Sequence, residues 1–187
     1  MQLKFKIQPY QTDAARAVTD VFKGQPNSGA SMYLRDLGRT RARNGMEVME
    51  GFQAQVELTE GYANAPIELG AERLLQNLNA VQRANRVPVS ASLAKGPAPV
   101  NLDVEMETGT GKTYVYTKTM LELNRLYGWS KFIVVVPSVA IREGVYKSLQ
   151  GTEQHFFEQY GKAIRYFVYD SSRLGELDRY SRAPTST

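Results

Sequence analysis

Residues 102–114 read LDVEMETGTGKTY, and this stretch decides the fold of the chain. A strand pattern runs into a glycine-containing loop, and a helical pattern follows the loop. Gly109 and Gly111 allow a tight turn whose backbone N–H groups point at phosphate oxygens. Lys112 adds a positive charge for the β- and γ-phosphates, and Thr113 offers a hydroxyl to Mg²⁺. The stretch therefore predicts a nucleotide-binding loop, with the positive end of the helix dipole directed at the same anion.

The loop departs in one place from the usual pattern G-x-x-x-x-G-K-[ST], because its first position is Met106. A structural turn that happens to carry a lysine is the competing interpretation. The strand pattern before the loop and the helical pattern after it favour nucleotide binding. Glu105 and Glu107 alternate at the end of the strand pattern, and we interpret them as solvated or structural carboxylates without a catalytic role.

Composition limits the classes of protein that the chain can represent. Its 187 residues suffice for one α/β domain with a buried core, but not for two complete nucleotide-motor domains. A net charge of +4 is compatible with a polyanionic partner without establishing one. The absence of cysteine excludes disulfides and cysteine-ligated zinc, and the single histidine, His155, is expected to be exposed or at a helix end. We find no signal peptide and no long apolar run, and therefore predict a cytoplasmic protein without membrane contact.

Helical periodicity is clear in four places. The first predicted helix begins near Pro9 and ends before Gly24 and the turn-forming residues after it. The last two follow the glycine loop and the block that begins at Val136. Helices are predicted at residues 8–23, 68–85, 112–126 and 140–150.

Three segments have the pattern of buried strands. The clearest, at residues 131–138, contains a continuous β-branched run that suits a central parallel strand buried on both faces. The others begin at residue 102 and span 165–169. Alternation of strands and helices predicts an α/β fold with a doubly wound parallel sheet, whose ligand lies at the carboxyl ends of the strands.

Residues 30–100 look like an insertion or an elaborated connection before the loop. Within them we predict a turn at 43–46, a half-exposed strand at 52–59 and a loop over 86–99. The same region contains a group of four arginines with few aromatic residues between them. This composition favours a solvated, salt-bridged surface over a phosphate-contacting patch. This group consists of Arg35, Arg39, Arg41 and Arg43.

Three blocks occur in the order of a known family: Tyr10-Gln11 at a helix start, residues 106–113, and VPSVAIREG at residues 136–144. Together they resemble the first motor domain of superfamily 2 helicase-like ATPases. More narrowly, the chain is similar to the Res subunit of type III restriction–modification enzymes over residues 3 to about 180. The resemblance implies a P-loop (RecA-like) parallel sheet in an incomplete first motor domain. Its regions would be 1–29 for adenine reading, 30–100 as the insertion and 101–187 as the first part of the ATPase domain.

The resemblance also implies the roles of individual residues. Gln11, with Tyr10 beside it, inherits adenine recognition, and its amide suits the adenine edge geometrically; the alternative is an exposed residue at a helix start. Lys112 and Thr113 inherit the catalytic positions, and Thr113 inherits the metal position. The nucleotide-contacting loop residues would be Thr108, Gly109, Thr110, Gly111, Lys112 and Thr113.

The third block resembles the motif that contacts the backbone of the tracked DNA strand. Pro137, Ser138 and Arg142 are the positions that would touch DNA, with Arg142 suited to a phosphate. The competing interpretation of Ser138 is a helix cap, which a strand-to-helix junction requires in any case.

The resemblance makes the chain the amino-terminal part of an ATP-dependent DNA restriction endonuclease motor subunit. ATP and Mg²⁺ would be its cofactors, with double-stranded DNA and a modification (methyltransferase) subunit as partners. No Asp-Glu-x-x box, second motor domain or carboxylate-lysine nuclease motif occurs in the sequence. The chain therefore resembles an amino-terminal fragment, and whether it hydrolyses ATP alone is left open. Another helicase-like DNA or RNA motor is one alternative. A non-catalytic, nucleotide-responsive binding module that uses residues 30–100 for partner contact is the other.

Overall fold

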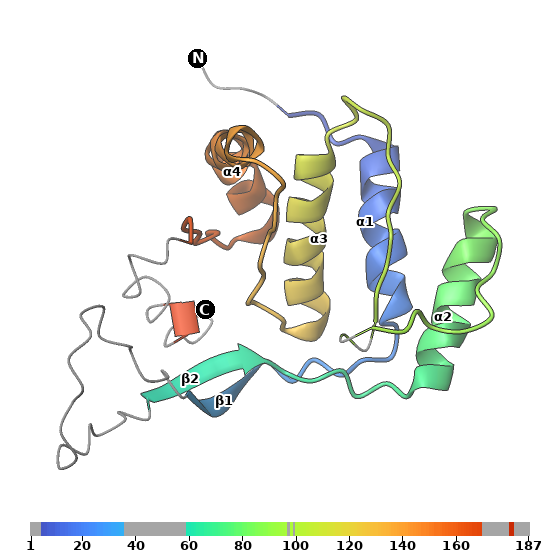
Figure 1. Ribbon diagram of the computed structural model, residues 1–187. Coiled ribbons are helices and arrows are strands. Elements are labelled where there is room, and N and C mark those ends of the chain that lie inside the picture. Colours follow the sequence, from blue (N-terminus) through green and yellow to red (C-terminus); the bar gives the residue numbers. More distant parts are fainter. Residues whose placement is uncertain (1–4, 36–58, 97, 99, 170–179, 182–187) are drawn as a thin grey trace, which may run out of the picture.

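The computed structural model describes residues 5–35, 59–96, 98, 100–169 and 180–181. Helices dominate this part, and one short antiparallel hairpin accompanies them (Figure 1). In chain order the elements are α1 (Pro9–Val21), β1 (Ala30–Arg35), β2 (Thr59–Asn64), α2 (Ala71–Ala84), α3 (Lys112–Tyr127) and α4 (Val139–Tyr160).

Helix α1 is central, between α3 on one side and α2 on the other (Figure 1). It begins at Pro9, whose fixed φ suits the first helical turn. Helices α1 and α3 run in the same direction, because Lys118 in the middle of α3 bonds to Thr12 near the start of α1, and Tyr127 at the end of α3 bonds to the Thr19 carbonyl near the end of α1. The start of α1 therefore lies beside the start of α3.

An aromatic core joins the ends of α1 and α3 to α2. Phe22 packs edge-on against Trp129 with ring centroids 5.0 Å apart, and Leu74 of α2 completes the cluster. The Trp129 indole N–H donates to the Ala65 carbonyl at 2.9 Å, so this large side chain is buried without losing a hydrogen bond. Asn77 of α2 donates to two carbonyls at the end of α1, at 2.9 Å each. These contacts fix the helices that carry the site.

Helix α4 is longer than predicted, since it continues past Gln150 to Tyr160. Gly151 weakens a helix locally, but tertiary packing overrides this cost. Phe156 is 0% exposed and stacks on Tyr114 of α3 with centroids 4.9 Å apart. Gly161, at φ 65°, then ends the helix.

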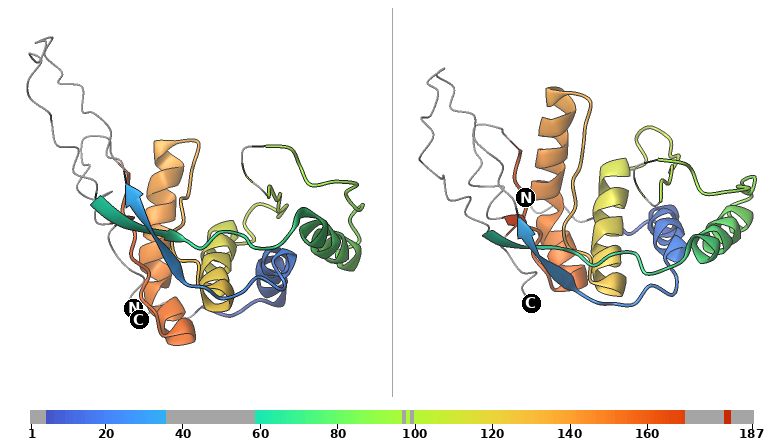
Figure 2. Two further views of the ribbon diagram at one scale, coloured as in Figure 1. Left: turned by 90° about the horizontal axis from the view of Figure 1, so that it is seen from below. Right: turned by 60° about the horizontal axis from the view of Figure 1, so that its bottom comes forward.

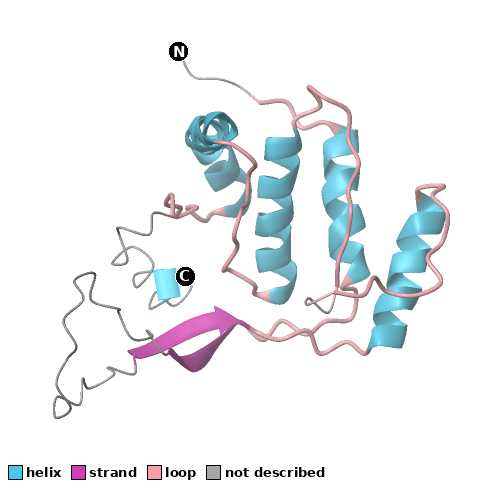
Figure 3. Ribbon diagram, viewed as in Figure 1, coloured by secondary structure: helices cyan, strands magenta, loops and turns pink. Residues whose placement is uncertain are grey.

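The three predicted parallel strands are not strands in the described residues. Segments 102–107, 131–138 and 165–169 lack ladder partners there, and loops connect α2 to α3 and α3 to α4 (Figure 3). The expectation that residues 131–138 are buried is wrong, because Ile133 and Val135 are 83% and 87% exposed. The physical reason is that a parallel strand is buried only between neighbouring strands and covering helices. The described residues supply no neighbouring strand for 131–138, so Ile133 and Val135 stay exposed although Phe132 packs against the core.

The observed sheet is the β1–β2 hairpin, which the sequence analysis did not predict. Ala30 pairs with Asn64, and the hairpin lies at the end of the molecule where α1 and α3 finish (Figure 2). The Asn64 side chain bonds to the backbone of Ser130 and Lys131, which ties the hairpin to the segment after α3. The predicted turn at 43–46, most of the predicted strand at 52–59, and Arg39, Arg41 and Arg43 lie outside the described residues.

The described part thus combines α and β elements, as the α/β prediction requires at its coarsest level. Residues 87–96 and 98 are irregular, in agreement with the predicted loop over 86–99. None of the helices in the described ranges has both the length and the apolar character that a membrane crossing demands.

Candidate nucleotide-binding site

The glycine loop contains the tight turn that the sequence predicts. The Thr110 hydroxyl donates to the Glu107 carbonyl at 2.6 Å and closes the turn. Gly109 and Gly111 have φ values of 84° and 86°, in the left-handed region that favours glycine. A Cβ atom on Gly109 would meet nothing within 4 Å, so this glycine is required by its backbone conformation and not by crowding.

Helix α3 starts directly after this turn and has no side-chain cap. Its N-cap is Gly111, and the first helical hydrogen bond runs from the Val115 N–H to the Gly111 carbonyl at 3.0 Å. The N–H groups of the first turn therefore have no carbonyl partner within the helix, and this gives the end of the helix a partial positive charge that favours anions. Lys112 is exposed and Thr113 half-buried there. The geometry fits a phosphate group with its Mg²⁺.

Two residues of α1 reach the loop from a hundred positions away in the sequence. The side-chain N–H of Gln11 donates to the Thr110 carbonyl at 3.0 Å, and the Tyr10 hydroxyl donates to the same carbonyl at 3.3 Å. Gln11 is only 9% exposed, so the alternative of an exposed helix-start residue is wrong. The structure thus brings the first two sequence blocks together. Adenine contact by Gln11 itself stays a prediction.

A groove adjoins the loop on the α2 side. It has a volume of about 1020 Å³ and runs between α1, α2 and residues 87–95 and 101–107. Tyr10, Met106 and Thr110 line it near the loop. Glu105 and Glu107 are exposed along its wall, in line with the interpretation that these carboxylates are solvated. A nucleoside bound to the loop therefore has open space beside Tyr10.

The predicted DNA block lies on a different helix. The Ile141 N–H donates to the Ser138 hydroxyl at 3.3 Å, so Ser138 caps α4 as the competing interpretation required. Arg142 forms an ion pair with Glu143 at 3.1 Å, and Pro137 is exposed. Among the described residues, no recorded contact joins these three positions to the glycine loop. Their contact with DNA stays a prediction.

One neighbour of the loop was missed by sequence reasoning. Tyr114, which follows Thr113, shares a 2.9 Å hydrogen bond with His155 of α4. The expectation that His155 is exposed or at a helix end is wrong, because α4 continues and brings this ring against Phe5 and Phe156. Burial lowers the pKa of His155, which favours the neutral ring. The available signal was the aromatic pair that follows His155, which suggests a buried face beyond Gln150.

Magnesium has one candidate protein ligand in the loop, Thr113. In the ranges that the structure describes, no group of three or more His, Cys, Asp or Glu side chains could hold a metal ion. A Mg²⁺ ion at this site would therefore be held chiefly by phosphate oxygens and water, as is usual for nucleotide-bound magnesium.

Comparison with known proteins identifies relatives of the chain. The chain is similar to the Res subunit of the Escherichia coli type III restriction-modification enzyme EcoP15I, 34% identical over 124 residues, which are 65% of this chain and 13% of that protein. It is 35% identical over 112 residues to the EcoPI Res subunit of Escherichia phage P1, covering 59% of this chain and 11% of that protein. A 62-residue stretch is 53% identical to the StyLTI Res subunit of Salmonella typhimurium strain LT2, covering 32% of this chain and 6% of that protein.

The chain therefore spans about an eighth or less of the length of these relatives. The family model for "Type III restriction enzyme, res subunit" matches residues 4–173, which include the Tyr10-Gln11 block, the glycine loop and the block that begins at Val136. The chain belongs to the family of type III restriction enzyme Res subunits.

Proposed function

We propose that this chain is the part of a type III restriction motor subunit that binds Mg-ATP and contributes to DNA contact. The proposal rests on one observation: Tyr10 and Gln11 both donate hydrogen bonds to the Thr110 carbonyl, at the start of α3, which has no side-chain cap. In the whole enzyme this part would serve ATP-driven translocation on double-stranded DNA and its cleavage, together with a modification subunit. These wider roles rest on the family to which the chain belongs.

Each residue of the site has a distinct task in this proposal. Backbone N–H groups from Gly109 to Thr113 and the Lys112 ammonium hold the phosphates, and the Thr113 hydroxyl joins the coordination of Mg²⁺. Gln11 uses one side-chain N–H on Thr110, so its second N–H and its carbonyl oxygen remain for adenine. Bound Mg-ATP supplies the γ-phosphoryl group whose transfer to water drives a motor of this kind.

The proposal includes the RecA-like parallel sheet. Segments 102–107, 131–138 and 165–169 would be its strands in the whole Res subunit. Their support is physical: Val104, Ile133 and Val135 expose large β-branched side chains, an arrangement that is stable when neighbouring strands cover it. The glycine loop follows the first of these segments, where a parallel sheet places its ligand.

Replacing Lys112 by alanine is expected to weaken Mg-ATP binding roughly 10- to 100-fold. A charge-assisted hydrogen bond contributes about 1.5–3 kcal/mol, and each 1.4 kcal/mol is about tenfold in affinity. Isothermal calorimetry of the 187-residue chain with Mg-ATP measures the effect. Lys147→Ala is the matched control, because Lys147 is an exposed lysine on α4. Equal binding by the Lys112 variant and the parent, or no binding by either, would remove the proposed function.

Replacing Arg142 by alanine is expected to weaken binding of double-stranded DNA and to make it less sensitive to salt. One lost phosphate contact lowers the slope of log affinity against log salt concentration by about 1. Fluorescence anisotropy with a labelled duplex at several salt concentrations measures both effects. Arg16→Ala is the control, since Arg16 of α1, like Arg142, is an arginine paired with a carboxylate of its own helix. If the two variants lose affinity equally, Arg142 has no specific place in the DNA site.

A further inference from the structure

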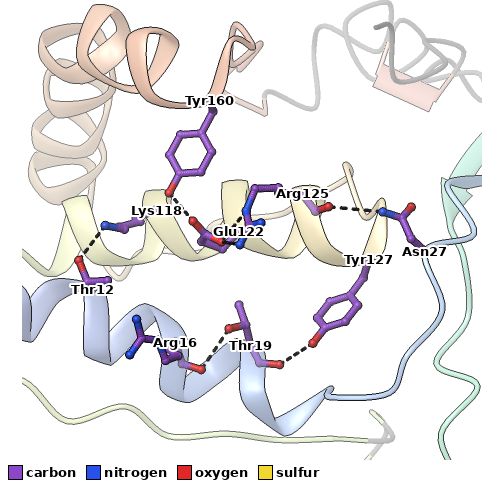
Figure 4. A network of polar contacts seen from close by, with 9 residues as sticks. All are labelled: Thr12, Arg16, Thr19, Asn27, Lys118, Glu122, Arg125, Tyr127 and Tyr160. Atoms are coloured by element: carbon purple, nitrogen blue, oxygen red, sulfur yellow. Dashed lines mark hydrogen bonds and ion pairs between the residues drawn. The ribbon is translucent and has the colours of Figure 1, made fainter.

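Lys118 of α3 is buried without an ion-pair partner among the described residues. Its side chain lies between α3 and α1, and the residue is 6% exposed. Its ammonium donates to the Thr12 hydroxyl at 2.8 Å (Figure 4). No carboxylate oxygen of the described residues lies within 4.0 Å of the Lys118 ammonium nitrogen, which is the limit for an ion pair. An ammonium with so little exposure and a single hydroxyl partner opposes folding, so stability alone does not explain a lysine here.

The nearest acidic side chain on α3 is already engaged elsewhere. One oxygen of Glu122 accepts from the Tyr160 hydroxyl at 2.8 Å, and the other pairs with Arg125 at 2.6 Å (Figure 4). Glu122 therefore serves the contact of α3 with α4. Burial lowers the pKa of Lys118, an effect that the charge of Glu122 opposes and that of Arg16 reinforces. Thr12 is the specific partner that remains for the ammonium.

Thr12 is the residue after Gln11, in the turn of α1 that touches the glycine loop. Its backbone N–H donates to the Gln8 carbonyl at 3.2 Å, which places it in the first turn of the helix. Tyr10 and Gln11 bind the loop, and Thr12 binds the helix that follows the loop. Three consecutive residues of α1 are thus hydrogen-bonded to the glycine loop or to α3, and Lys118 makes the third of these bonds.

We propose that Lys118 is a positioning residue for base recognition: its bond to Thr12 sets the first turn of α1 so that the Gln11 amide faces both Thr110 and an adenine base. The inference rests on the proposed function, because it assigns Gln11 to the base. A glutamine amide matches adenine bidentately, with an acceptor for the exocyclic amine and a donor for N7. Guanine offers acceptors at both places, so a displaced amide loses preference for adenine before it loses phosphate binding.

Lys118→Met separates this role from a purely structural one. Methionine fills a similar volume, favours helices and removes the buried charge, so the thermal midpoint should stay equal or rise. The preference for Mg-ATP over Mg-GTP, measured by calorimetry on the full 187-residue chain, should fall roughly 3- to 10-fold, an effect of about one hydrogen bond. Lys147→Met on α4 is the matched control and should keep the preference.

Thr12→Val is the second variant, because it removes the acceptor and keeps the side-chain shape. It should also lower the preference for Mg-ATP over Mg-GTP, and it tests the role of Lys118 if Lys118→Met does not fold. Unchanged preference in the folded variants, with a parent that selects ATP, would overturn the role of Lys118 and leave the proposed function standing. A parent that binds no Mg-ATP, or that binds ATP and GTP equally, would overturn the proposed reading of adenine by Gln11 and this inference with it.

Discussion

Replacing Gly128 by alanine is expected to lower the free energy of unfolding by roughly 2–5 kcal/mol. Gly128 ends α3 with φ at 76°, where a residue with a Cβ atom costs about 1–2 kcal/mol. The Cβ atom would also lie 2.6 Å from the Asn27 side-chain oxygen and 2.8 Å from the backbone of Gly29. Backbone cannot swing aside as a flexible side chain can, so overpacking adds roughly 1–3 kcal/mol.

Thermal unfolding followed by far-ultraviolet circular dichroism checks this result. For a chain of this size the expected loss corresponds to a midpoint roughly 4–20 °C lower. Gly144→Ala is the control, because Gly144 lies within α4 and its Cβ atom would meet nothing within 4 Å. Alanine there should stabilise the helix by about 0.5–1 kcal/mol. The close contact of Gly128 with residues 27–29 would be refuted if both alanines shifted the midpoint alike.

Local signals predicted the limits of the two helices beside the glycine loop. Pro9 and the glycines of the loop determine where α1 and α3 begin, and these signals depend on backbone conformation alone. The predicted helices at 8–23 and 112–126 therefore differ from α1 and α3 by two residues or fewer at each end. The sequence analysis did not predict the contact of Gln11 with the loop, because no local pattern links positions 99 residues apart.

The exposure of residues 131–138 and the burial of Lys118 depend on tertiary contacts, which sequence patterns do not show. A β-branched run such as residues 131–138 predicts a strand only on the assumption that neighbours cover it, and Ile133 is exposed because the described residues supply no neighbouring strand. Lys118 was missed because a lysine is normally assigned to a solvated helix face. Its position offered a signal, since it lies three residues after Val115 and one before Thr119, both buried on the same helix.

Gly111→Ala is expected to reduce both the affinity for Mg-ATP and the preference for adenine. At φ 86° the alanine costs about 1–2 kcal/mol in the conformation that binds phosphate, which corresponds to roughly 5- to 30-fold in affinity. Its Cβ atom would lie 2.7 Å from the side-chain nitrogen of Gln11. Because this nitrogen terminates a flexible side chain, Gln11 should move away from Thr110 while the helix stays in place.

Gly109→Ala separates backbone strain from the collision with Gln11. Gly109 has nearly the same φ, 84°, but its Cβ atom would meet nothing within 4 Å. Strain alone should weaken Mg-ATP and Mg-GTP by the same factor, whereas Gly111→Ala should weaken Mg-ATP more. In a Gln11→Ala background the two glycine replacements should become equivalent, because the side chain that Gly111 accommodates is gone. If Gly111→Ala still weakens Mg-ATP selectively in that background, something other than Gln11 reads the base. Gly111 would thus serve two purposes, a left-handed turn for phosphate and room for the amide that selects adenine.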